Sequence, residues 1–142
     1  MEKDIDILDE LNKGCSMGCE EIDMIMKKVD NIEFNELLDD QKNGYIELSN
    51  KIDELYRTKS NKDIHEAGTM TKLMTWYGIQ KDTILDNSTS KIADILINGT
   101  NMGIIEGRKL LNNKAMDKKT KKLVTEYIKM QERYIEKLKK YL

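Results

Sequence analysis

The sequence contains one short motif twice, and this repeat constrains the fold more than any other feature. The first copy holds Leu11, Gly14, Met17, Gly18 and Glu21, and the second holds Leu96, Gly99, Met102, Gly103 and Glu106. Both copies keep the same internal spacing and begin stretches whose apolar residues recur at alternating steps of three and four, which is typical of one helix face. A weaker match follows, between residues 45–47 and 134–136. The chain therefore predicts a helical hairpin that occurs twice and folds into one bundle.

Composition agrees with an all-α fold. The chain has 142 residues, no proline and a single phenylalanine, and 35% of its residues are charged. Lys, Glu, Asp, Leu, Ile and Met dominate, whereas β-rich domains use more Val, Thr and aromatic residues. A chain of this length most simply forms one domain with a core of its own, so we expect a single domain over residues 1–142.

The apolar pattern predicts four long helices, over residues 4–29, 32–57, 89–111 and 117 to the end. Asp30 and Asn31 separate the first two, and Ser88 and Asp117 are expected to cap the last two. Between residues 60 and 86 we expect an extra, shorter helix that begins at a capping box on Ser60 and Asp63. The connections are then short, long and short, and the long one can cross the length of the bundle.

Charge is unevenly distributed along the chain. Residues 1–60 hold 8 Lys or Arg against 16 Asp or Glu, and residues 114–142 hold 10 against 4. Such asymmetry favours pairing within the chain or between copies, and we expect a homo-oligomer, with a dimer as the first choice. The basic end has no interleaved aromatic residues, so we expect no nucleic-acid partner. The acidic start and the lack of a long apolar run predict a cytoplasmic protein without a membrane segment.

The four motif glycines require an explanation, because glycine inside a helix costs about 1 kcal/mol relative to alanine. The first interpretation is a close helix–helix contact, in which the two glycine-bearing helices press together at Gly14, Gly18, Gly99 and Gly103. The second is that the glycines leave room between the helices for a ligand, an ion or water. Gln41, Tyr45, Gln131 and Tyr134 lie on or near the predicted buried faces, and we expect them to form a hydrogen-bond network.

Two cysteines lie four residues apart on the first helix. Cys15 and Cys19 point the same way from one helix and are poorly placed to form a disulfide, so we expect buried, reduced thiols. The alternative is that they bind a soft ion such as Cu(I).

Two glutamates are the candidate metal ligands. Glu21 and Glu106 follow the glycines at the same spacing and fall at or beside the inner face of their helices. A carboxylate near a core must be paired, protonated or bound to a cation. Carboxylates on two facing helices are the groups with which helical bundles hold iron or manganese.

The overall pattern resembles the ferritin-like superfamily and, more closely, a group of uncharacterised bacterial four-helix-bundle proteins distantly related to rubrerythrin. Residues 14–18 and 96–111 carry this resemblance. It implies one Glu from each first helix, matched by Glu21 and Glu106, and a Glu-x-x-His from each second helix. Asn50 and Lys139 stand where the two histidines would be, so a standard di-iron site is not expected.

We therefore expect an all-α, ferritin-like four-helix bundle built from a duplicated helical hairpin, with an extra helix in the long crossover. Our first hypothesis is a non-enzymatic protein that acts through assembly or partner binding, has lost its di-iron site and needs no cofactor. The alternative is a degenerate metal-binding protein that uses Glu21 and Glu106 to hold Fe or Mn for redox or storage chemistry.

Overall fold

The computed structural model describes residues 2–60 and 88–142, and these form an all-α bundle. Its long helices are α1 (Glu2–Met26), α2 (Ile32–Lys59), α4 (Thr89–Asn113) and α5 (Lys118–Leu138), and one turn of 3₁₀ helix, η1 (Lys139–Tyr141), follows α5. All four predicted long helices are confirmed, with ends displaced by a few residues. The extra helix and the capping box with Asp63 lie outside the described residues.

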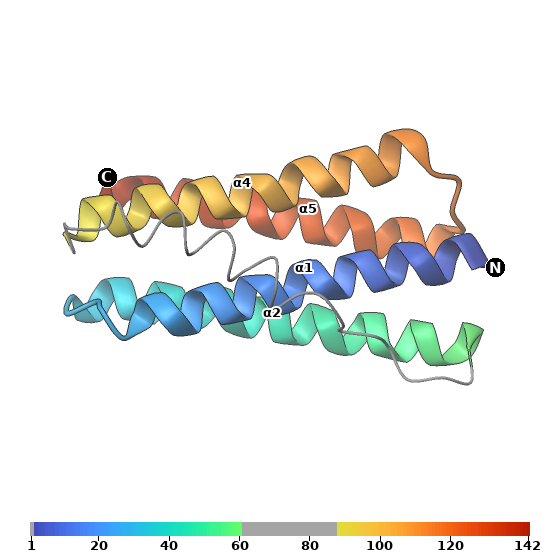
Figure 1. Cartoon of the computed structure of the whole chain (residues 1–142), viewed down its shortest axis with the longest axis horizontal. Coiled ribbons are helices and arrows are strands. Elements are labelled where there is room, and N and C mark those ends of the chain that lie inside the picture. Colours follow the sequence, from blue (N-terminus) through green and yellow to red (C-terminus); the bar gives the residue numbers. More distant parts are fainter. Residues whose placement is uncertain (1, 61–87) are drawn as a thin grey trace.

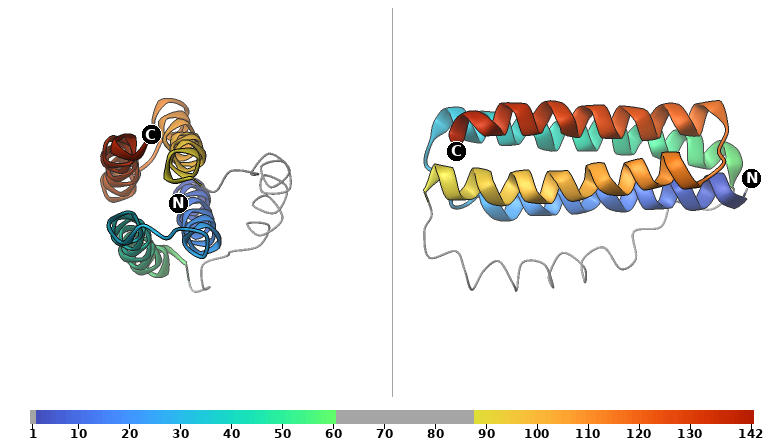
Figure 2. Two further views of the ribbon diagram at one scale, coloured as in Figure 1. Left: turned by 90° about the vertical axis from the view of Figure 1, so that its left-hand side faces the viewer. Right: turned by 90° about the horizontal axis from the view of Figure 1, so that it is seen from above.

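The helices form two antiparallel hairpins that lie side by side (Figures 1 and 2). Contacts are densest between α1 and α2 and between α4 and α5, and the hairpins meet where α2 faces α5 and α1 faces α4. The end of α2 and the start of α4 lie at opposite ends of the bundle (Figure 1). The second connection therefore joins opposite ends of the bundle, as predicted.

Side-chain caps explain where three of the helices begin. The Asn31 side chain accepts a hydrogen bond from the Phe34 backbone N–H at 2.9 Å at the start of α2. Ser88 caps α4 in the same way, and Asp117 caps α5 by accepting from the Thr120 backbone N–H at 2.8 Å. These bonds satisfy amide groups that a helix leaves without partners in its first turn, so the predicted caps at Ser88 and Asp117 are confirmed.

The core follows the predicted apolar faces. Buried side chains on these faces include Leu8, Leu11, Cys15, Ile22, Ile25, Phe34, Leu38, Ile52, Ile92, Leu96, Leu123 and Leu138. The faces are also wider than predicted, because Ile7, Ile95, Val124 and Ile128 are buried as well. Burial of these side chains removes apolar surface from water and provides the main driving force for folding.

A polar cluster joins three helices at one end of the bundle. The Lys59 ammonium pairs with the Asp117 carboxylate and lies 3.8 Å from Asp4 Oδ2. The Asp117 backbone N–H donates to Asp4 Oδ1 at 3.1 Å. The Lys59 side chain is only 13% exposed. This lysine therefore neutralises two aspartates that lie close together at the ends of α1, α2 and α5.

Replacing Lys59 with Met should lower the free energy of unfolding by about 1–2 kcal/mol, because Asp4 and Asp117 then lose their shared counter-charge in a shielded place. Urea denaturation at neutral pH measures the change. Lys51→Met is the matched control, since the Lys51 side chain is 59% exposed in its 3.3 Å pair with Glu126. The control should change stability by less than about 0.5 kcal/mol. Equal effects of the two variants would contradict a special role for the cluster.

Candidate functional site

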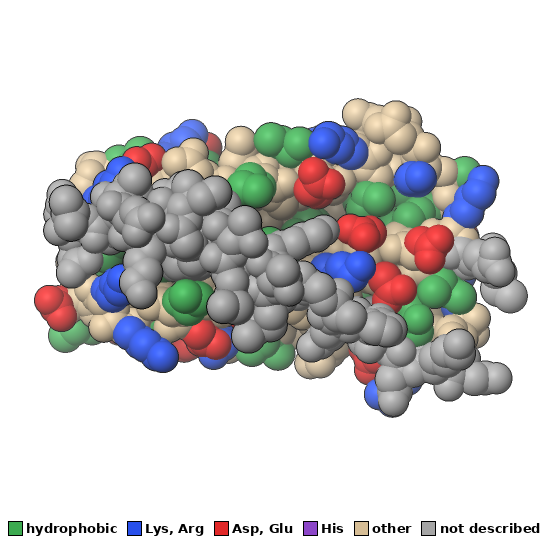
Figure 3. All heavy atoms as spheres, viewed as in Figure 1, with side chains coloured by type: hydrophobic (Ala, Val, Ile, Leu, Met, Phe, Trp, Pro, Cys, Tyr) green, Lys and Arg blue, Asp and Glu red, His purple; other side chains and the backbone are tan. Residues whose placement is uncertain are grey.

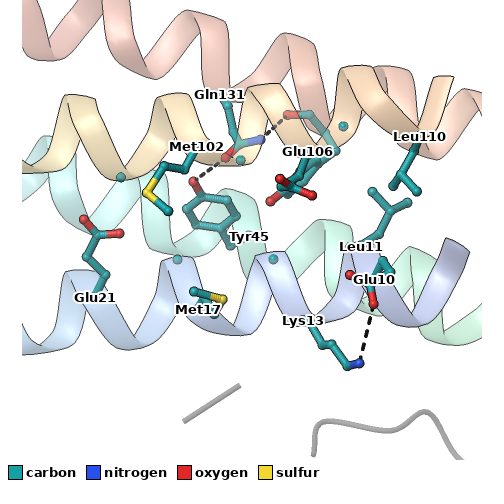
Figure 4. Close-up of a pocket in the computed structure, with 16 residues that line it drawn as sticks. Glu10, Leu11, Lys13, Met17, Glu21, Tyr45, Met102, Glu106, Leu110 and Gln131 are labelled. Atoms are coloured by element: carbon teal, nitrogen blue, oxygen red, sulfur yellow. Dashed lines mark hydrogen bonds and ion pairs between the residues drawn. The ribbon is translucent and has the colours of Figure 1, made fainter. Parts of the chain in front are cut away.

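A cavity lies between α1 and α4, beneath the two copies of the glycine motif (Figure 4). Its volume is about 330 Å³. All five residues of each motif copy except Leu96 line it, together with side chains from α2 and α5. The lining consists of Glu10, Leu11, Lys13, Gly14, Met17, Gly18, Glu21, Tyr45, Gly99, Met102, Gly103, Glu106, Gly107, Leu110, Tyr127 and Gln131.

The motif glycines make room for side chains that reach across the bundle. A Cβ atom at Gly18 would lie 2.5 Å from the Tyr45 ring, and one at Gly14 would overlap the Tyr127 hydroxyl. On α4, a Cβ at Gly99 would overlap the Glu21 carboxylate and one at Gly103 would overlap the Gln131 amide. At all four positions the obstructing atoms belong to side chains. Only at Gly99 does that side chain come from the other glycine-bearing helix, so the four glycines do not form the direct α1–α4 contact that the first interpretation predicted.

Polar groups connect α2, α4 and α5 beside the cavity. The Tyr45 hydroxyl donates to Gln131 Oε1 at 3.2 Å, and Gln131 Nε2 donates to the Tyr127 carbonyl oxygen at 3.3 Å (Figure 4). Gln41 Nε2 donates to Thr100 Oγ1 at 3.2 Å. The predicted network is therefore present in part, and it includes Thr100, which the sequence analysis missed.

Tyr134 does not belong to this network. Its hydroxyl donates to the Asp40 carbonyl oxygen at 2.9 Å, where α5 packs against α2. Gln131 lies against Gly103 as Tyr45 lies against Gly18. The position that corresponds to Tyr45 in the second hairpin is therefore Gln131, and the sequence match of residues 45–47 with 134–136 is displaced by three residues from the structural correspondence.

Glu21 places its carboxyl group inside the bundle. The carboxylate lies against Gly99, and its Oε1 atom is buried, although the side chain as a whole is only partly buried. Burial raises the pKa of Glu21 from 4.5 to about 8, because a charged carboxylate is poorly solvated there. Burial likewise raises the pKa values of Tyr45 and Tyr127 above their usual value. All three groups are therefore mainly neutral at pH 7.

Glu106 lies at the solvent-exposed side of the cavity. Its side chain is 69% exposed, and its Oε1 atom is 3.5 Å from the Lys109 ammonium. Glu10 and Lys13 form a second pair on the same rim, at 3.6 Å. Acidic side chains gather on this face, where α1 and α4 lie side by side toward the N-terminal end of α1 (Figure 3).

The structure does not bring Glu21 and Glu106 together. Glu21 lies opposite Gly99, and Glu106 follows Gly99 by seven residues, which corresponds to about 10 Å along a helix. Within residues 2–60 and 88–142, no three His, Cys, Asp or Glu side chains come close enough to hold a metal ion. Glu47 and Glu136, which lie three residues before Asn50 and Lys139, are exposed. These residues therefore do not fit a centre in which two carboxylates share one ion.

The two cysteines form no disulfide with each other, as predicted, but only one of them is fully buried. Cys15 is buried and Cys19 partly buried, and the Cys19 thiol lies 3.8 Å from the Lys42 carbonyl oxygen. Burial raises the pKa of Cys15 well above its usual value, chiefly through desolvation. Since the thiolate is the form that binds metals and attacks electrophiles, Cys15 is better suited to packing than to chemistry.

Comparison with known proteins gave no match: no family model fits the chain, and no curated protein or solved structure is significantly similar to it. None of the helices in the described part of the chain combines the length and the apolar character that crossing a membrane requires. The site must therefore be interpreted from its own chemistry.

Replacing Glu21 with Gln should make the stability of the protein less dependent on pH. The pKa of Glu21 is higher in the folded state than in the unfolded state, so its contribution is fully present below about pH 4.5 and is lost as the pH rises through about 8. We expect the variant to match the wild type at pH 4 and to be more stable by up to about 5 kcal/mol at pH 9, as measured by urea denaturation. A constant difference at both pH values would contradict the burial of a titrating carboxyl group.

Replacing Gly18 with Ala should lower stability by about 1–3 kcal/mol despite the better helix propensity of alanine, because the buried Tyr45 ring cannot move freely. A double-mutant cycle with Tyr45→Ala tests this cause. In the Tyr45→Ala background, Gly18→Ala should become stabilising by about 1 kcal/mol. The same loss in both backgrounds would show that Tyr45 does not impose the glycine.

Proposed function

We propose that this protein is a non-enzymatic binding protein whose α1–α4 cavity takes a small, elongated organic ligand. The observation that carries this proposal is the cavity itself, because its volume of about 330 Å³ lies in the range of small-molecule sites. Leu11, Met17, Met102 and Leu110 supply apolar lining, and a few polar groups converge on it. This mixture is typical of pockets that recognise ligands.

The chemistry of the lining supports binding more than catalysis. Neutral Tyr45 and the Gln131 amide are already hydrogen-bonded to each other, which fixes their positions and makes them rigid recognition groups. Glu21 is a neutral acid at pH 7 and can donate or accept a hydrogen bond. Met17 and Met102 are flexible and polarizable, so they can adapt to the shape of an apolar chain.

We further propose that the bundle is a ferritin-like fold derived from a duplicated hairpin and distantly related to rubrerythrin, with an extra helix between residues 61 and 87. The crossover from the end of α2 to the opposite end of the bundle supports this relation, as does the motif on both α1 and α4. In this interpretation the cavity occupies the region between the first helices of the two hairpins. Binding of Fe or Mn through Glu21 and Glu106 remains the alternative, in the form of a weak pair of ions with one at each carboxylate.

Methyl signals of the methionines can test whether small molecules enter the cavity. With methyl-labelled methionine, binders from a library of short alkyl amines, alcohols and acids should shift the NMR signals of Met17 and Met102. The signal of Met116, which lies in the connection between α4 and α5 and does not line the cavity, should not move. If the metal alternative holds, Mn(II) should instead broaden the Met17 and Met102 signals at low concentration.

Two matched tryptophan variants identify the site. Met102 and Ile105 are both about half exposed on α4, but only Met102 lines the cavity. Met102→Trp should fill the cavity and weaken binding at least tenfold, whereas Ile105→Trp should leave binding unchanged. The proposed function fails if no library member shifts both methionine signals, or if the two variants reduce binding equally.

A further inference from the structure

The two cavity carboxylates suggest which class of ligand the site selects. This inference rests on the proposed function, since it concerns the occupant of the same cavity. We propose that the cavity binds a linear aliphatic dication, a diamine or polyamine, with one ammonium group at Glu21 and another at Glu106. The alkyl chain between them would lie along α1 and α4.

The separation of the carboxylates sets the length of the ligand. Glu21 lies at Gly99, and Glu106 lies two helical turns further along α4, about 10 Å away along the axis. One metal ion or one ammonium group cannot reach both. A chain of several methylene groups with an amine at each end can.

The lining between the two carboxylates suits such a chain. Met17, Met102 and Tyr45 lie between Glu21 and Glu106 (Figure 4). The methionines offer apolar contact to methylene groups, and the ring of Tyr45 adds a surface that attracts a nearby cation. The site is thus acidic at both ends and apolar in the middle.

The charge around the cavity favours a cation over an anion. Three of the lining side chains are carboxylic acids and one is a lysine. The charge of Lys13 is balanced by Glu10 on the rim, at 3.6 Å, so the lining retains an excess of carboxylic acids. Glu106 does contact Lys109, but that pair is largely exposed, and pairs of this kind contribute little, so a ligand ammonium can replace the lysine.

Binding should be linked to the ionisation of Glu21. Tyr45 from α2 and Tyr127 from α5 interact electrostatically with Glu21 and are both neutral at pH 7, and α4 presents the uncharged Gly99 to it. An ammonium group beside the carboxylate lowers the pKa of Glu21. Since Glu21 is mainly protonated at pH 7 in the free protein, complex formation should release up to one proton, and affinity should rise between pH 7 and pH 9.

Isothermal titration calorimetry with octamethylenediamine tests the inference on the full chain. Octylamine has the same chain with one charge, and trimethylenediamine has both charges on a chain too short to span the carboxylates. We expect octamethylenediamine to bind about threefold or more tightly than octylamine, since the second contact is exposed. Trimethylenediamine should bind no more tightly than octylamine. Titrations in buffers of different ionisation enthalpy measure the number of protons released for each ligand that binds.

Variants in which Gln replaces Glu test whether each carboxylate binds one ammonium group of the ligand. Glu106→Gln should abolish the preference for octamethylenediamine over octylamine, and Glu21→Gln should weaken both ligands at least about tenfold and abolish proton release. Glu126→Gln, on α5 and outside this cavity, is the matched control and should change nothing. Circular dichroism verifies that each variant is folded, which the similar shape of Gln and Glu favours.

The outcomes separate this inference from the proposed function. Neutral alcohols or octylamine could shift the NMR signals of Met17 and Met102 while octamethylenediamine binds no better than octylamine. In that case the proposal of a dication is wrong, and the proposal of a ligand-binding cavity is retained. Binding of octamethylenediamine that persists unchanged in Glu21→Gln also overturns the inference. If no molecule of any class enters the cavity, both proposals fail.

Discussion

The interior of this bundle depends on side chains that occupy the space where α1 and α4 lack a Cβ atom. Tyr45 and Tyr127 lie against the glycines of α1, and Gln131 and the Glu21 carboxylate lie against those of α4. Each glycine weakens its helix by about 1 kcal/mol, and the contact it permits compensates by bringing a large or polar side chain into the centre of the bundle. The same residues therefore determine both how side chains pack against α1 and α4 and the shape of the cavity.

This arrangement gives the centre of the bundle an unusual polarity. A four-helix bundle commonly fills its centre with Leu and Ile, whereas here a glutamate, two tyrosines and two glutamines approach one another from three helices, α1, α2 and α5. Such groups are tolerated in the interior when they are hydrogen-bonded or neutral. Tyr45 and Gln131 are hydrogen-bonded to each other, and the raised pKa of Glu21 keeps its carboxyl group mainly neutral at pH 7.

Much of the fold could be predicted from the sequence, because its periodicity and caps are local signals. The spacing of residues within one helix is enough to identify its apolar face and its cap. This applies to the faces that contain Leu8, Phe34, Ile92 and Leu123 and to the caps at Ser88 and Asp117. The environments of Glu21 and Glu106 could not be predicted in this way. Their positions in the motif are equivalent, yet one carboxyl group is buried against Gly99 and the other is exposed beside Lys109.

The side chains that pack against the glycines also could not be identified from the sequence. Gly14 meets Tyr127 because of how the two hairpins dock, and Gly103 meets Gln131 because of the register of α4 against α5; no pattern within one helix encodes either arrangement. The same limitation explains why Tyr134 was matched with Tyr45, although a shift of three residues places Gln131 there. Within one helix the sequence indicates the buried face; between helices the register depends on packing that only the three-dimensional structure reveals.

The division into two hairpins has a consequence for how the protein folds. Contacts within each hairpin join residues that are close in sequence, so each hairpin can form with a small loss of chain entropy before the two dock. The α1–α4 cavity exists only after docking, because each hairpin supplies one of its walls. A molecule held there binds the docked state and not the separate hairpins, so its binding free energy adds directly to the stability of the assembled bundle.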